Sequence, residues 1–308
     1  MLRGRACYRR LRGRPAPACK VGLDQRQGTS QPFRARSAAC VEASAPAMRT
    51  VVYQSYRSDQ VPTWLSSCMR TVREWASQSG YEYRLFDDEF FSFAPDWFRQ
   101  RADHQICPVT DLARLVAAKN FLAQDFDRAI WVDADVVVFA PDKLVVDTSS
   151  GFTLCHEVWP YTDPTGRSGV SKRVNNCIAA FQKGTIHLDF LIDACLRIAH
   201  NKTKLGKLDV GTAFLTQLRG ILPFPLLMNV GSFGPAILAD IAVGDGPRLR
   251  DYAEALPLPL ACANLCASLA GANGTGMAGH ERIYEAATSR CIETRGAVVN
   301  RLVPAGTR

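Results

Sequence analysis

The chain has 308 residues, of which 47% are hydrophobic and 21% are charged, a composition typical of a folded globular protein. Residues 1–47 hold ten of the 37 Lys and Arg residues and two of the 29 Asp and Glu residues, so this segment carries the whole formal charge of +8. The remainder has no net charge, which argues against a nucleic-acid partner. Its two long uncharged stretches, 220–239 and 255–279, are rich in Pro or Gly, so we expect no transmembrane segment.

Two interpretations of residues 1–47 are open. The segment is Arg-rich and poor in acids, as a basic tail or a transit peptide would be. We favour a disordered or mis-started leader, because a strand-like run at 50–53 follows Met48 at once. We therefore expect one folded domain over 48–308. The 11 cysteines form no Cys-x-x-Cys pair, which indicates a reducing compartment and a cytoplasmic protein.

Strand-like and helical patterns alternate along this domain. They predict strands at 51–56, 83–86, 129–133, 151–155 and 174–182. They predict helices at 62–78, 108–124, 186–199, 210–218, 236–242, 261–270 and 281–294. A β/α half followed by a more helical half predicts an α/β fold with a mainly parallel central sheet. The Pro, Gly and Ser content of 159–173 predicts a mobile flap.

Two carboxylates interrupt the apolar run at 129–139. The strand 129–133 ends at Asp133, and in extended backbone Asp133 and Asp135 point the same way. Ligands of open α/β sheets bind at the carboxyl ends of strands, and paired carboxylates repel unless a positive charge lies between them. Their hard oxygens suit Mn²⁺ or Mg²⁺, and such a cation can hold a nucleotide diphosphate. The alternative is a solvated turn after a strand.

The motif and the helix before it resemble those of known glycosyltransferases. The segment 126–139, with Asp-Ala-Asp at 133–135, is similar to the glycogenin-like galactosyltransferase family. Thr110-Asp111-Leu112-Ala113-Arg114 resembles the Ser-Asp-x-x-Arg helix of the capsular-polysaccharide and mannosyltransferase-like DXD sugar-binding family. The resemblance covers roughly residues 50–220. It implies a GT-A (nucleotide-diphospho-sugar transferase) fold, with helices flanking the sheet and a helical C-terminal part.

The resemblance also implies an activity. A metal-dependent hexosyltransferase of this kind moves a hexose from a UDP- or GDP-sugar to an acceptor hydroxyl with retention of configuration. Its partners are the nucleotide sugar and a glycan or lipid-linked acceptor, reached in the second case by peripheral membrane contact. Such activity belongs to polysaccharide biosynthesis.

The resemblance assigns roles to named residues. Asp133 and Asp135 are the metal and catalytic residues, with Ala134 between them at the substrate. The other substrate-binding residues are Tyr53, Ser55, Asp111, Arg114, Trp131, Asn175 and Asn176. Several also fit purely structural roles: Asp111 and Arg114 fit a surface ion pair, and the two asparagines fit a turn. Tyr53 and Ser55 fit a buried aromatic and a turn serine equally well.

Two further residues, Asp209 and His280, fit either a functional role or a structural one. Asp209 precedes a predicted helix, so it is either a cap or a catalytic, acceptor-side residue. The His-rich motif that supplies a third metal ligand in the glycogenin-like family is not evident, and His280 is the nearest candidate. A lone His also serves as a helix cap.

Two other functions compete with the transferase. A haloacid-dehalogenase-type phosphatase also has Asp-x-Asp after an apolar strand, but normally on its first strand, and here about eighty residues of β/α pattern precede the motif. The other rival is a catalytically inactive nucleotide-sugar-binding homologue.

Overall fold

The computed structural model describes residues 48–305 except 104 and 270–276, and the leader predicted at 1–47 lies outside this part. The strands are β1 (Thr50–Ser55), β2 (Glu82–Phe86), β3 (Arg128–Val132), β4 (Val136–Val138), β5 (Phe152–Thr162), β6 (Ser168–Gln182), β7 (Leu226–Leu227), β8 (Val230–Ser232) and β9 (Cys262–Asn264). The helices are α1 (Thr63–Gln78), α2 (Asp96–Arg101), α3 (Ile106–Ala123), α4 (Ile186–Asn201), α5 (Thr212–Ile221), α6 (Pro235–Val243), α7 (Pro247–Glu254), α8 (Met277–Glu293) and α9 (Ala297–Asn300). Three short 3₁₀ helices are η1 (Asp88–Phe93), η2 (Pro141–Lys143) and η3 (Ala267–Leu269).

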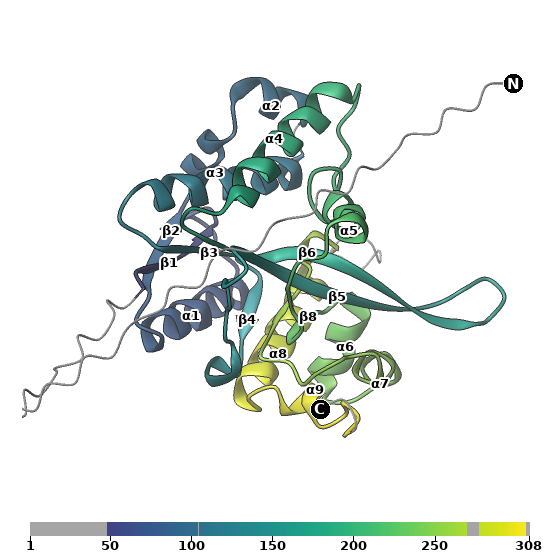
Figure 1. Ribbon diagram of the computed structural model, residues 1–308. Coiled ribbons are helices and arrows are strands. Elements are labelled where there is room, and N and C mark those ends of the chain that lie inside the picture. Colours follow the sequence, from purple (N-terminus) through teal and green to yellow (C-terminus); the bar gives the residue numbers. More distant parts are fainter. Residues whose placement is uncertain (1–47, 104, 270–276, 306–308) are drawn as a thin grey trace, which may run out of the picture. The chain divides into compact units, whose positions relative to one another are not determined.

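The central sheet has six strands in the order β2-β1-β3-β6-β5-β7. β1 pairs in parallel with both β2 and β3, and β5 pairs in parallel with β7. β6 pairs antiparallel with both β3 and β5, so it alone runs against the other five. The predicted fold class, an α/β fold with a mainly parallel sheet, flanking helices and a helical C-terminal part, is confirmed (Figure 1).

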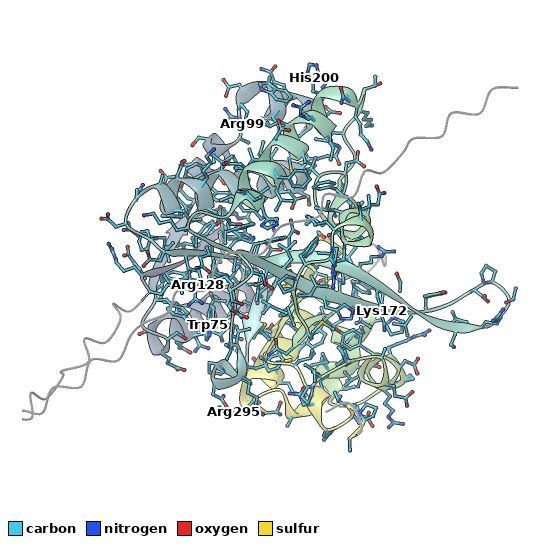
Figure 2. All side chains as sticks on the ribbon, viewed as in Figure 1. Trp75, Arg99, Arg128, Lys172, His200 and Arg295 are labelled. Atoms are coloured by element: carbon cyan, nitrogen blue, oxygen red, sulfur yellow. The ribbon has the colours of Figure 1, made fainter. Side chains whose placement is uncertain are left out.

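The two faces of the sheet are buried in different layers. Alternate residues of β1 and β3 point to opposite faces. Tyr53 and Trp131 pack with apolar side chains of α3, α4 and α5, whereas Val52 and Ile130 pack with Trp75 of α1 and with β4. Figure 1 shows α3 and α4 on one side of the sheet and α1 on the other, and Figure 2 marks Trp75 on the α1 side.

After β3 the chain enters a second sheet, whose first strand is β4. It has the order β4-β9-β8, with β4 antiparallel and β8 parallel to β9. All nine residues of these three strands are buried. Asp133 and Asp135 therefore lie between the last residue of β3 and the first of β4, at the junction of the two sheets.

The segment 159–173, for which the sequence predicts a mobile flap, is regular β-structure over most of its length. β5 and β6 continue through it as a two-stranded ribbon, in which Trp159 pairs with Ser171 and Thr162 with Ser168. Only residues 163–167 turn, and Asp163 stabilises that turn by accepting hydrogen bonds from the amides of Thr165 and Arg167. In Figure 1 the outer end of the ribbon extends past the helices that flank the sheet.

The helix predicted at 261–270 is also wrong within the described residues. Cys262–Asn264 is a strand, and Ala267–Leu269 is a single 3₁₀ turn. The alanines favour a helix locally, but burial on both sides between β4 and β8 favours extended backbone. No described helix is long and apolar enough to cross a bilayer.

Candidate active site

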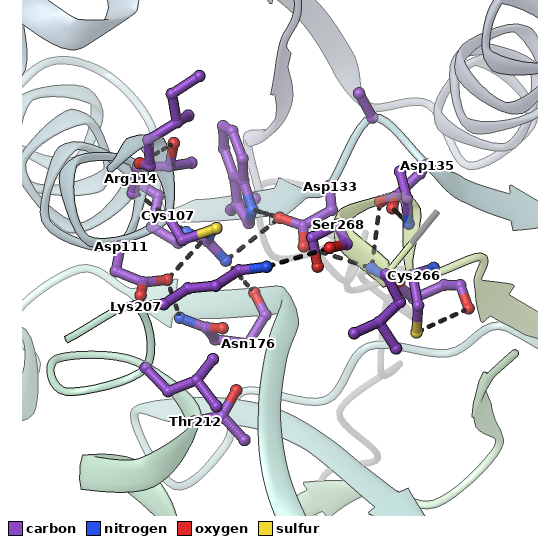
Figure 3. A pocket seen from close by; sticks show the side chains of 18 of the residues that line it. Cys107, Asp111, Arg114, Asp133, Asp135, Asn176, Lys207, Thr212, Cys266 and Ser268 are labelled. Carbon is purple, nitrogen blue, oxygen red and sulfur yellow. Dashed lines mark hydrogen bonds and ion pairs between the residues drawn. The ribbon is translucent and has the colours of Figure 1, made fainter. Parts of the chain in front are cut away.

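A pocket of about 550 Å³ opens where β3 ends. Eight of the twelve predicted site residues line it: Ser55, Asp111, Arg114, Trp131, Asp133, Ala134, Asp135 and Asn176. They come from β1, α3, β3 and its following turn, and β6. Figure 3 shows Asp111, Arg114 and Asn176 on one side of the pocket, with Asp133 and Asp135 farther across it. The structure thus brings eight of the predicted residues into one pocket, although they span more than a hundred positions of the chain.

Asp133 and Asp135 converge on one amide. The Nδ2 of Asn264, the last residue of β9, lies 3.4 Å from Oδ2 of Asp133 and 3.2 Å from Oδ1 of Asp135. Asn264 Oδ1 accepts from the Cys266 amide at 2.6 Å, which fixes the orientation of this side chain. The Ala267 amide donates to Asp135 Oδ2 at 2.8 Å. The two carboxylates therefore share a single donor, and their oxygens approach one point.

Arg114 is the buried cation of the site. Its Nη2 lies 3.2 Å from Asp111 Oδ1, and its Nη1 lies 3.2 Å from Asp133 Oδ1. Nη1 also donates to the Asn176 carbonyl at 2.6 Å, and the guanidinium lies over the Trp131 ring at 4.9 Å. The guanidinium thus joins α3 to β3 and β6. The predicted alternative, a surface ion pair, is wrong because Asp111 and Arg114 are both buried.

Burial shapes the protonation of this cluster. Burial raises the pKa of Asp111 and of Asp133, although Arg114 opposes the shift in both. Burial and then the charge of Asp133 raise the pKa of Asp135 to about 6. Burial alone would lower the pKa of Arg114, but Asp133 and Asp111 raise it, so the guanidinium stays charged. Ionised Asp135 is therefore the least well compensated charge of the group.

The two predicted asparagines face different partners. Asn176 Nδ2 donates to Asp111 Oδ1 at 2.9 Å, so Asn176 and Asp111 share one wall of the pocket. Asn175 does not line the pocket. Its Nδ2 donates to Glu157 Oε1 at 2.6 Å, and its Oδ1 accepts from the Cys177 amide at 2.7 Å. Asn175 therefore orients Glu157, which does line the pocket.

Two aromatic residues predicted at the nucleotide pack in the core, and of the two only Trp131 also lines the pocket. Tyr53 is fully buried outside the pocket, and its hydroxyl donates to the Arg114 carbonyl at 2.6 Å. Trp131 is 1% exposed, and its ring stacks on Phe90 at 4.9 Å. Its Nε1 donates to Asp133 Oδ1 at 2.6 Å, so Trp131 acts on the site by orienting that carboxylate.

Asp209 and His280 also lie outside the pocket lining. Asp209 accepts from the Gly206 amide at 2.6 Å and pairs with Lys202 at 2.8 Å, so it stabilises the turn before α5 rather than capping that helix. His280 is buried in α8. Within the described residues no cluster of three or more His, Cys, Asp or Glu side chains is placed to hold a metal ion.

Polar residues that line the pocket also include Glu157, Lys207 and Asn264, to which the sequence assigns no role. Lys207, in the turn before α5, extends across the pocket and donates to the Ser268 carbonyl at 3.2 Å (Figure 3). Arg173 of β6 also lines the pocket. In the described part of the chain no carboxylate pairs with Lys207 or Arg173, so both are available to an anionic ligand. No sequence signal marks Lys207 or Asn264, because neither belongs to the motif.

No protein-family model matches the chain, and no curated protein matches it. The solved structures that it resembles include a glycosyltransferase involved in the glycosylation of the major capsid of PBCV-1, with 14% identity, 77% of this chain and 98% of that chain covered, and a TM-score of 0.41. Another is the glycosyltransferase GlyE of Streptococcus pneumoniae TIGR4, with 13% identity, 85% and 66% coverage, and a TM-score of 0.36. A Drosophila β1,4-galactosyltransferase 7 complex with manganese, UDP-Gal and xylobiose matches with 11% identity, 59% and 77% coverage, and a TM-score of 0.26. Likenesses this low carry no functional argument, so the function rests on the residues of the pocket.

Proposed function

We propose that the protein is a metal-dependent glycosyltransferase of the GT-A type that uses a nucleotide diphosphate sugar. The observation that carries the proposal is the convergence of Asp133 and Asp135 on one point at the end of β3, in the same pocket as the buried Asp111–Arg114 pair. Sites of this kind lie at the carboxyl ends of strands, where a nucleotide ligand enters.

The donor set fits a divalent cation. One carboxylate oxygen of Asp133 and one of Asp135 lie within hydrogen-bonding distance of the same atom, Asn264 Nδ2. A cation near this position could bind both oxygens, and hard oxygens are the ligands that Mn²⁺ and Mg²⁺ prefer. Such a cation, when bound, neutralises the diphosphate and the charge that develops on it as it leaves. His280 as a third ligand and Asp209 as a catalytic residue stay predictions, because neither lines the pocket.

The remaining pocket residues bind different parts of the donor. Asp111 and Asn176 present adjacent oxygen and amide groups, suited to the hydroxyls of a donor sugar. Arg114 opposes the rise that burial causes in the pKa of Asp111 and Asp133, and it holds both carboxylates in position. Lys207 and Arg173 supply positive charge for the diphosphate without losing an existing ion pair. Hexose transfer and retention at the anomeric carbon stay parts of the proposal.

The acceptor side is partly apolar. Ile106, Leu208 and Leu269 line the pocket with 64%, 45% and 37% of their surfaces exposed. They come from the first turn of α3, the turn before α5 and η3. An acceptor that buries these side chains gains free energy roughly in proportion to the apolar area removed from water. This arrangement is compatible with both the glycan and the lipid-linked acceptors inferred from the resemblance.

A thermal-shift experiment tests the proposal. The full chain is melted with a panel of UDP- and GDP-sugars, each with Mn²⁺ and with chelator. A ligand at one hundred times its Kd adds about 2.7 kcal/mol to the free energy of unfolding. We expect at least one nucleotide sugar to raise Tm with Mn²⁺ but not with chelator. Asp135→Ala should abolish the shift, whereas Asp193→Ala, which changes an exposed carboxylate of α4, should keep it.

A folded protein that responds to none of these donors would contradict the proposal. Turnover of a phosphate ester would then favour the phosphatase, although β3 is not the first strand and its neighbour β6 is antiparallel. A metal-dependent shift without any sugar release, whether to water or to an acceptor panel, would favour the inactive homologue.

A further inference from the structure

Two aromatic side chains follow one another along β5. Trp159 and Tyr161 are two residues apart in the strand, so they lie on the same face, about 7 Å apart along the chain. Trp159 lines the candidate active site. Tyr161 lines a separate groove of about 370 Å³ between the β5–β6 ribbon and α7. Two neighbouring rings on one strand therefore line the active-site pocket and the groove, respectively.

A glycine lies against each ring. A Cβ placed on Gly234 would lie 3.1 Å from the Trp159 ring, and one placed on Gly169 would lie 2.7 Å from the Tyr161 ring. Contacts below 3.0 Å do not occur for real Cβ atoms, so Gly169 lets the Tyr161 ring lie directly against the opposite strand. Tyr161 is nevertheless 53% exposed, so its other surface is free. An exposed large aromatic held in this way is suited to stacking with a ligand.

The opposite wall of the groove is polar. Arg248, Asp251 and Glu254 recur every three residues on α7, so they share one side of the helix, and all three line the groove. Each is exposed, and in the described part of the molecule none of their side chains makes a hydrogen bond or ion pair. Their charged groups are therefore available to a ligand without the cost of breaking an internal contact.

We propose that this groove binds a neutral oligosaccharide, with one sugar ring on Tyr161 and the chain running along Trp159 toward the active site. A sugar ring has an apolar C–H face that stacks on an aromatic ring, and hydroxyls that accept from Arg248 and donate to Asp251 and Glu254. A wholly apolar ligand would leave those charges desolvated without partners. The groove volume lies within the range of ligand sites, about 300–1,000 Å³. That the oligosaccharide is the acceptor rests on the proposed function, whereas the binding site does not.

The test measures oligosaccharide binding to the full chain without donor. The probes are the linear tetrasaccharides of glucose, mannose, galactose, xylose and N-acetylglucosamine, each compared with its monosaccharide by saturation-transfer NMR and by titration calorimetry. We expect at least one tetrasaccharide to bind more tightly than its monosaccharide. Tyr161→Ala should weaken that binding about tenfold, and Tyr161→Phe, which keeps the stacking ring, should change it less than threefold.

The matched control is Trp97→Ala, which removes a 43% exposed aromatic on α2 that does not line the groove, and it should leave binding unchanged. Binding of no tetrasaccharide would overturn the proposal, as would a tetrasaccharide affinity that Tyr161→Ala leaves intact. Failure here is distinguishable from failure of the proposed function, because the Mn²⁺-dependent thermal shift with a nucleotide sugar does not involve Tyr161.

Discussion

Replacing Arg114 by methionine tests the buried charge cluster most sharply. Methionine keeps an apolar side chain of similar length but removes the cation that lies 3.2 Å from both Asp111 and Asp133. It also removes the donor to the Asn176 carbonyl. Breaking a buried pair by removing one partner costs about 3–5 kcal/mol, because an uncompensated charge is left behind. Domains of ordinary stability unfold with about 5–15 kcal/mol, so the variant should be strongly destabilised.

The assay is urea unfolding of the full chain with chelator present, followed by circular dichroism. A matched control is Arg197→Met, which breaks an exposed pair with Asp193 on α4 and should cost less than about 1 kcal/mol. A double variant, Arg114→Met with Asp111→Asn, also removes one of the two carboxylates that lose their cation in Arg114→Met. It should lose at least about 1 kcal/mol less than the sum of the two single variants. A loss below about 1 kcal/mol for Arg114→Met, or strict additivity in the double variant, would refute the buried network.

Three further predictions concern neighbouring groups. Gly211→Ala should destabilise the protein by about 1–3 kcal/mol and weaken donor binding, because a Cβ there would lie 2.3 Å from Asp111 Oδ2. The control is Gly220→Ala, whose Cβ meets nothing within 4 Å and which should not destabilise the protein. Equal urea midpoints for the two variants would contradict this prediction. Burial lowers the pKa of His156, and Lys172 and Arg219 add to this, so the unfolded chain binds more protons and stability should fall as pH drops through about 6.5. His156→Gln should flatten that part of the pH profile of urea unfolding; an unchanged slope would exclude His156 as its source. Trp131→Phe, which removes the Nε1 donor to Asp133, should weaken Mn²⁺-dependent donor binding in titration calorimetry more than Trp97→Phe does, and equal affinities would argue against an orienting role.

The sequence predicts the part of the fold where pattern and burial agree. The run at 129–132 is continuously apolar, and these four residues of β3 are all buried, as such a run requires. The helical spacing before it gives α3, and Asp111 and Arg114, three residues apart, point together into the site. These local rules predict the two elements, whereas the expectation that Asp111 and Arg114 lie at the same site as the carboxylates comes from the family resemblance.

Long-range pairing decides what the sequence does not predict. The segment 159–173 contains Pro, Gly and Ser, yet cross-strand pairing of β5 with β6 makes it a ribbon. Cys262–Asn264 forms a strand because β4 and β8 lie on either side of it. Asn264 reaches Asp133 from 131 residues away, so no local pattern could have identified it. Lys207 is likewise placed in the pocket by the turn that precedes α5.

Release of nucleoside diphosphate from a nucleotide sugar by the full chain tests the central claim most directly. The reaction is run with the donor that gives the largest thermal shift, with Mn²⁺ or with chelator, for the wild type and for Asp135→Asn. The account predicts release with Mn²⁺ that chelator abolishes and that Asp135→Asn reduces at least a hundredfold, while the variant stays folded. Release that is equal with chelator, or that Asp135→Asn leaves intact, would contradict the assignment of Asp133 and Asp135 to a cation on the diphosphate.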